Sequence, residues 1–163
     1  MPNRLHKQLK LYFCLNRIHY EDGGAGVGYL AETIKVSRRT VERYLADFMA
    51  LGVRVSFDYS ESGAWHNIKS KDIDVTNDPM PFADYNLLES PKHKRLYRLC
   101  DFIALYANEN SQKKVDISLY KENYNISRYT ALRDLDELRQ IGFEFQYLSK
   151  QKVYSIIARP EVY

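Results

Sequence analysis

The chain is poor in cysteine and has no long apolar run. Only two of its 163 residues are cysteine, Cys14 and Cys100, and each stands in an apolar stretch without a partner at C-x-x-C spacing. We therefore expect two reduced core thiols of a cytosolic protein, not a disulfide or a zinc site. No stretch approaches the roughly 20 apolar residues of a membrane span, and residues 1–10 lack the apolar core of a signal peptide. A cytoplasmic protein without membrane contact is expected.

The usual signatures of enzymes and cofactor sites are also missing. The glycine run at residues 23–28 follows a helical pattern and precedes no Gly-Lys-Ser/Thr, so it is interpreted as an inter-helix loop and not as a phosphate cradle. The four histidines form no metal-binding spacing with the cysteines. No Ser/His/Asp order or carboxylate pair indicates catalysis. We expect no enzymatic activity, no cofactor and no metal.

Hydrophobic and charged residues are both plentiful, and the charges are unevenly distributed. Hydrophobic residues make up 45% of the chain and charged residues 28%, which predicts a folded core. Residues 1–59 hold nine Lys or Arg against six Asp or Glu, and residues 91–163 hold thirteen against nine. Residues 60–90 hold two against six. Two basic units around an acidic connector are typical of units that face a polyanion, although chance variation on solvated surfaces gives the same distribution.

An internal repeat relates the two basic stretches at an offset of 90 residues. Residues 4–59 align without a gap to residues 94–149. Identical residues meet at six positions near the centre of the alignment: Ser37 and Ser127, Arg38 and Arg128, Thr40 and Thr130, Arg43 and Arg133, Leu45 and Leu135, and Gly52 and Gly142. The spacing of apolar and turn-forming residues recurs as well, so the sequence predicts a duplicated unit.

Each unit has the pattern of three helices. The apolar spacing predicts first helices that include residues 5–15 and 96–106, second helices at about 27–34 and 117–124, and third helices at about 38–51 and 128–141. Polar loops are expected between the first two helices of each unit, at residues 21–26 and 108–114. Ser37 and Ser127 are suited to cap the third helices, and Gly52 and Gly142 to follow them in a left-handed conformation.

The same spacing predicts which residues form the core. Leu45 and Leu135 occupy matched apolar positions of the third helices, where Val41 and Phe48 also turn toward the core. Leu105 has core spacing in the first helix of the second unit.

A β-hairpin is expected after each third helix. The apolar period changes to two at residues 53–58 and 143–147, and further strand-like runs follow at 64–68 and 153–157. Three helices and a hairpin make a winged helix-turn-helix domain. The predicted fold is therefore α+β, mostly helical, with two tandem domains of this kind.

The domain boundaries follow from composition. The first domain is expected at residues 1–70, an acidic connector at 71–91 and the second domain at 92–163. Prolines break regular structure in the connector. Its apolar side chains predict that it packs on a domain: Phe82, Tyr85, Leu87 and Leu88.

The third-helix segments resemble a known family. Residues 36–45 (Val-Ser-Arg-Arg-Thr-Val-Glu-Arg-Tyr-Leu) and 126–142 (Ile-Ser-Arg-Tyr-Thr-Ala-Leu-Arg-Asp-Leu and onward to Gly) look like the helix-turn-helix of DeoR-type repressors. They are also similar to the N-terminal domains of WYL-type bacterial regulators. The second unit keeps the Arg-Asp-Leu of the family pattern, whereas the first has Arg-Tyr-Leu at residues 43–45. The resemblance implies DNA binding, and we expect no effector domain of the kind that usually follows in these regulators.

Candidate DNA-binding residues begin the third helix of each unit, because the start of that helix enters the major groove in a helix-turn-helix. Arginine there can bond to guanine or phosphate, and serine and threonine suit phosphate contacts. In the first unit the candidates are Ser37, Arg38, Arg39, Thr40 and Arg43. In the second they are Ser127, Arg128, Tyr129, Thr130 and Arg133, with Lys150 and Lys152 beside the second wing turn.

The second unit is expected to be the weaker DNA reader of the two. Asp134, Asp136 and Glu137 follow its candidate residues closely, and some of them are expected to pair with Arg133 and Arg139. The first wing turn, residues 60–63, lacks basic residues, and its nearest are His66 and Lys69.

The predicted function is sequence-specific binding of double-stranded DNA, as a transcriptional regulator of a bacterium, phage or mobile element. One alternative is a protein-docking or chromosome-organisation factor, with a protein partner or self-association. A plasmid or phage replication initiator is another. Salt-sensitive affinity for DNA distinguishes the DNA-binding functions from the docking module.

Overall fold

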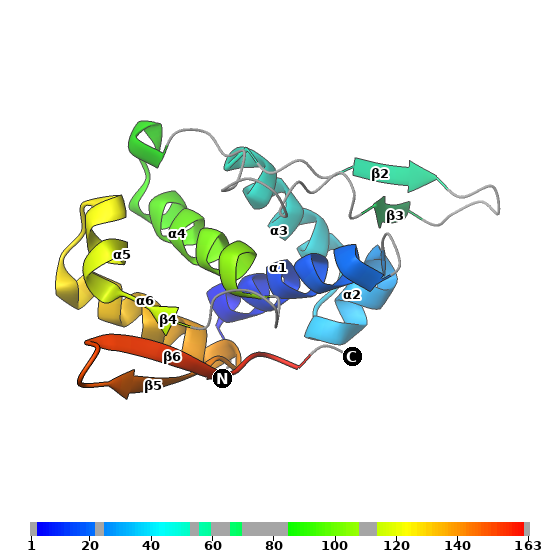
Figure 1. The fold of residues 1–163 in the computed structure, drawn as a ribbon. Coiled ribbons are helices and arrows are strands. Elements are labelled where there is room, and N and C mark those ends of the chain that lie inside the picture. Colours follow the sequence, from blue (N-terminus) through cyan, green and yellow to red (C-terminus); the bar gives the residue numbers. More distant parts are fainter. Residues whose placement is uncertain are drawn as a thin grey trace.

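A computed structural model of the chain describes residues 3–21, 25–52, 56–59, 66–69, 85–107 and 114–161. Over these residues the fold is α+β and mostly helical, as the sequence predicts (Figure 1). The helices are α1 (Arg4–Glu21), α2 (Val27–Ile34), α3 (Arg38–Ala50), α4 (Pro91–Tyr106), α5 (Ile117–Tyr124) and α6 (Arg128–Ile141), with a short 3-10 helix, η2 (Tyr85–Leu87). The strands are β1 (Ala25–Gly26), β2 (Ser56–Tyr59), β3 (His66–Lys69), β4 (Lys114–Val115), β5 (Glu144–Leu148) and β6 (Val153–Ala158).

The strands form two small antiparallel sheets with corresponding strand orders, β1-β3-β2 and β4-β6-β5. The β2–β3 and β5–β6 pairs lie where the sequence predicts strands, but Val53 to Val55 fall outside the described residues. The expected loops before α2 and α5 are partly wrong, because their last residues pair with a hairpin strand: Ala25 with Ile68, and Lys114 with Ser155. A two-residue strand is too short to show alternation in sequence.

The turns before α3 and α6 have the same backbone geometry 90 residues apart. Lys35 and Asn125 adopt positive φ angles of 58° and 51°. The amide of each following residue donates to a carbonyl five positions back, Val36 to Ala31 at 3.0 Å and Ile126 to Lys121 at 3.1 Å. Past the helices, Gly52 and Gly142 have φ angles of 94° and 121°, the positive values expected for them. Sequence and local geometry thus repeat at one offset.

The buried apolar side chains of the described residues form one cluster that draws on both halves of the chain. Helix α1 contacts both α4 and α6 (Figure 1). Phe13 of α1 meets Phe143, which follows α6, edge to face at 5.9 Å between ring centroids. Leu45 and Leu135 are buried as predicted, and so are Val41 and Phe48. The cluster fixes α1 against the second half of the chain.

Two apolar predictions are wrong. Leu105 is 50% exposed although its spacing predicts a core position, because it lies on the outer side of α4. Leu87 of the connector is 75% exposed, whereas Tyr85 and Leu88 are partly buried as expected and Phe82 lies outside the described residues. Tyr85 packs its ring 5.0 Å from that of Tyr124 on α5. The end of the connector is therefore held by Tyr85 and by Leu88, which packs against the core, and not by Leu87.

Candidate nucleic-acid interface

Helix α3 begins at a serine cap, as the sequence predicts. Ser37 has an extended backbone, and its Oγ accepts a hydrogen bond from the Thr40 amide at 3.1 Å. The two hydroxyls lie 2.9 Å apart. Such a cap satisfies one of the amides that a helix start leaves unpaired. The cap fixes where the helix begins and hence which side chains point outward from its first turn.

Three arginines surround this first turn. Arg38, Arg39 and Arg43 are exposed, and none forms an ion pair with a carboxylate of the described residues. Arg43 Nη2 donates to Thr40 Oγ1 at 3.2 Å, which holds its guanidinium near the start of the helix. Arg38 lies against α2, since a Cβ at Gly28 would come within 2.8 Å of Arg38 Nη2. The start of α3 therefore presents concentrated positive charge.

Helix α6 repeats the cap and adds an aromatic ring. Ser127 Oγ accepts from the Thr130 amide at 3.1 Å, and its backbone angles match those of Ser37. Tyr129 is 70% exposed, and the Arg133 guanidinium lies 5.7 Å from the centre of its ring. Arg128 is exposed beside them. An exposed ring carrying a stacked cation is suited to contact a base or a sugar–phosphate chain.

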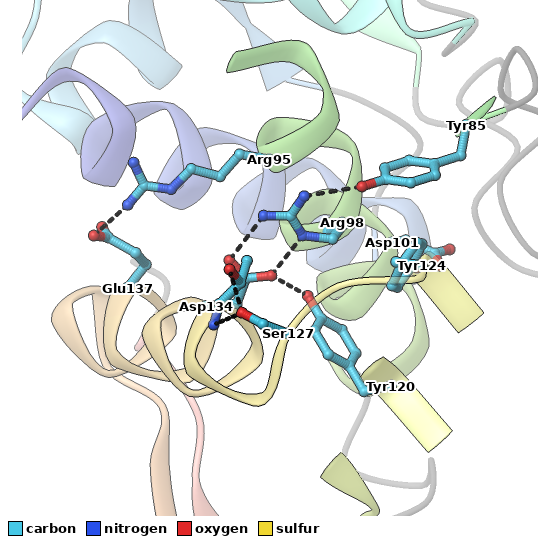
Figure 2. A network of polar contacts seen from close by, with 10 residues as sticks. Tyr85, Arg95, Arg98, Asp101, Tyr120, Tyr124, Ser127, Asp134 and Glu137 are labelled. Atoms are coloured by element: carbon cyan, nitrogen blue, oxygen red, sulfur yellow. Dashed lines mark hydrogen bonds and ion pairs between the residues drawn. The ribbon is translucent and has the colours of Figure 1, made fainter. Parts of the chain in front are cut away.

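The acidic residues of α6 form ion pairs with basic side chains of the protein, as Figure 2 shows for Asp134 and Glu137. Asp134 is buried against Arg98 of α4, at 2.7 Å from its Nε and 3.2 Å from its Nη2. Glu137 pairs with Arg95 and lies 2.5 Å from His6 Nε2. Asp136 pairs with Arg139, as expected.

The expected pairing of Arg133 with one of these acids is wrong. Among the described residues Arg133 forms no ion pair, because Asp134 turns inward to α4 and Glu137 turns to α1 and α4. Asp134 follows Arg133 directly but lies on the buried face of the helix, whereas Arg133 is exposed. The acids therefore neutralise the exposed cations of α6 less than their number in the sequence indicates.

The buried Arg98 is held by three hydrogen bonds. Besides the two bonds to Asp134, its Nη1 donates to Tyr85 Oη at 3.0 Å. Burial works against the charged guanidinium, but the bonds and charge of Asp134 outweigh it and raise the pKa of Arg98. Tyr120 Oη also donates to Asp134 Oδ2, at 2.7 Å. Helices α4, α5 and α6 are thus tied together beneath the exposed start of α6.

A hollow of about 490 Å³ opens above this network, between α4 and the start of α6. Lys94, Thr130 and Arg133 line it. The sequence pattern does not indicate Lys94, because this residue lies more than thirty residues before α6 and comes near it only through the packing of α4 on α6. Its ammonium lies 5.6 Å from the ring centre of Tyr85.

The two hairpins, β2–β3 and β5–β6, are described unequally. Lys150 and Lys152 are exposed at the turn between β5 and β6, and Lys152 adopts a φ of 55°. They extend the basic residues of the second half onto its sheet. The first wing turn, residues 60–63, lies outside the described residues, and only the backbone pairing of His66 and Lys69 is described for its neighbours.

Comparison with known proteins gives no match: no family model, no curated protein and no solved structure matches the chain. Within the described ranges, no helix has the length and apolar character required to cross a bilayer. The site must therefore be interpreted from its own geometry and chemistry.

Proposed function

We propose that the protein binds double-stranded DNA sequence-specifically through the starts of α3 and α6. The observation that carries the proposal is a serine-capped helix start, present twice, with exposed cations that no described carboxylate neutralises. In a helix-turn-helix the corresponding residues meet base edges in the major groove. The basic pI of about 8.7 agrees with a polyanionic partner.

Two tandem winged helix-turn-helix domains are the architecture that we propose. The element order helix, strand, helix, helix, strand, strand occurs twice along the chain. Strand order, the positive φ before the third helix and its capping bonds recur with it. A duplication accounts for all of these with a single event, whereas independent origins would need each coincidence separately.

The exposed residues divide into base readers and phosphate contacts. We assign Arg39 to a base edge, because it lies at the start of α3 and has no described partner. Arg43 donates a hydrogen bond to the Thr40 hydroxyl, and we assign it to a contact with phosphate or a flanking base. In the second half, we assign Arg128 and Tyr129 to the base contacts. We assign Lys94, which lines the hollow beside Thr130 and Arg133, and the exposed Lys152 to phosphate contacts.

The biological role proposed is transcriptional regulation in the cytoplasm of a bacterium or by a phage or mobile element. Two readers in one chain address two neighbouring sites without requiring a dimer. Because α1 packs on both α4 and α6, the second reader is braced by the first half of the chain. A replication initiator would use the same DNA-binding surfaces and would differ in the location of its target.

Selection of bound duplexes from random DNA tests the proposal. We expect enrichment of one motif, and an affinity for it that falls steeply with salt because bound cations displace counterions from the phosphates. A scrambled duplex of the same length and composition serves as the control. If no motif is enriched and no salt-sensitive binding occurs, the DNA-binding proposal is wrong and a protein-docking role takes its place.

A further inference from the structure

Asp101 is a partly buried residue, and one of its carboxylate oxygens is buried and unsatisfied. It lies on α4, and its Oδ2 accepts a short hydrogen bond from Tyr124 Oη, whereas Oδ1 has no hydrogen-bond partner among the described residues. Burial raises the pKa of this carboxyl, and the bond from Tyr124 opposes part of that rise. Buried polar atoms in native proteins are nearly always paired, so an orphaned carboxylate oxygen indicates a missing interaction.

The same residue lines a cavity of about 220 Å³ between α4, β4 and α5. Aromatic rings form much of its wall. The ring centre of Phe102 lies 4.5 Å from that of Tyr106, and Tyr120 lies 5.2 Å from Tyr124. The faces of such rings carry negative charge density and attract cations. A carboxylate among aromatic rings is a favourable environment for an organic cation.

Two of the tyrosine hydroxyls that line the cavity are already used as donors. Tyr124 donates to Asp101, and Tyr120 donates to Asp134 at 2.7 Å. The charges that line the cavity are two carboxylates, Asp101 and Asp116, and one ammonium, Lys114, whose Nζ donates to Gln151 at 2.8 Å. The cavity therefore has an excess of negative charge and few free donors, which disfavours an anion.

An apolar rim completes the cavity. Leu105 and Leu119 line it, and their side chains are 50% and 57% exposed. Exposed leucines beside a polar cavity offer surface to the apolar part of a ligand. The volume is below the range of about 300–1,000 Å³ that is usual for drug-sized ligands, so the occupant is small.

We propose that this cavity binds a small organic amine, with its ammonium group beside Asp101 and the tyrosine rings and its apolar body on Leu105 and Leu119. The ammonium need not touch Oδ1, because opposite charges stabilise each other over about 4–6 Å. None of the proposed DNA contacts lines this cavity, so amine binding can be tested without DNA.

Titration of the full chain with 2-phenylethylamine and with the neutral 2-phenylethanol tests the proposal, followed by calorimetry or by shifts of amide resonances. We expect the amine to bind at least about tenfold more tightly than the alcohol, since only the amine interacts with the carboxylate. Asp101→Asn keeps an acceptor for Tyr124 but removes the charge, and should abolish the preference. No amine binding at millimolar concentration, equal binding of both probes, or an unchanged preference in Asp101→Asn overturns the proposal.

A surface variant keeps the test decisive if Asp101→Asn fails to fold. Leu119→Lys adds a positive charge at the rim and should weaken amine binding several-fold without weakening alcohol binding to the same extent. The matched control is Leu87→Lys, at an exposed leucine that does not line the cavity. Equal amine affinity in Leu119→Lys and Leu87→Lys contradicts the proposed site.

Discussion

Asp134 on α6 and Arg98 on α4 form a doubly hydrogen-bonded ion pair in which the two side chains are 2% and 8% exposed. At the matched positions 90 residues earlier, the chain has Tyr44 and Gln8, both buried. Both partners therefore differ between the halves. The first half thus has neither the aspartate nor the arginine of the pair at these positions.

We expect removal of both partners of this ion pair to destabilise the protein less than removal of Arg98 alone. Arg98→Met leaves Asp134 as an uncompensated buried charge and should lower the free energy of unfolding by about 3–5 kcal/mol. The double variant Arg98→Met, Asp134→Leu leaves no buried charge and should be more stable than the single variant. Urea denaturation measures both. A loss below about 1 kcal/mol in Arg98→Met, or a double variant less stable than the single one, contradicts the assigned role of the pair.

The core assignment makes a separate prediction. Leu45→Ala and Leu135→Ala should each lower the free energy of unfolding by about 2–5 kcal/mol, through lost burial and the cavity left behind. Leu105→Ala, at a half-exposed position of α4, should change it by about 0.5 kcal/mol or less. Thermal or urea unfolding followed by circular dichroism provides the comparison. Similar losses at all three positions would show that the buried faces are assigned wrongly.

Asp101 predicts a pH dependence of stability. Because burial raises its pKa in the folded state, the folded protein binds a proton here more readily than the unfolded chain. Stability from this group is therefore greatest at low pH and is lost as pH rises through the folded-state pKa. Asp101→Asn should be more stable than the parent near neutral pH, and the difference should shrink as pH falls. Urea unfolding from about pH 7 to about pH 4 measures it; a pH-independent difference contradicts the prediction.

The helices could be predicted from sequence because their signals are local. Ser37 and Ser127 predict the helix N-caps, and the apolar spacing predicts that Leu45 and Leu135 are buried; the structure confirms both. The short strands β1 and β4 could not be predicted, since two residues show no period and their pairing depends on a distant hairpin.

The candidate site was predictable only in part. Its exposed arginines follow from the helix starts, but the inward turn of Asp134 toward Arg98 depends on how α4 packs against α6. The same packing brings Lys94 near Thr130 and Arg133. From the sequence alone, Asp134 is one of the acids expected to pair with Arg133 and Arg139. Only the three-dimensional arrangement shows that Asp134 faces the core and pairs with Arg98.

The central claim, DNA reading by the helix starts, depends on what Arg39 and Arg43 contact. Loss of a base contact should remove about 1–3 kcal/mol of discrimination at one base pair, and we expect this for Arg39→Ala. Loss of a phosphate contact should weaken all sites alike and reduce the salt slope by about one, which we expect for Arg43→Ala. Arg139→Ala, which removes an equal charge near the far end of α6, is the control.

The most direct measurement is a titration of these three variants and the parent against the selected duplex and its scrambled control at several salt concentrations, after circular dichroism has verified folding. We predict that Arg39→Ala loses preference between the duplexes, that Arg43→Ala loses affinity for both, and that Arg139→Ala resembles the parent. If folded Arg39→Ala and Arg43→Ala bind both duplexes as the parent does, α3 does not read DNA and the central claim fails for the first half of the chain.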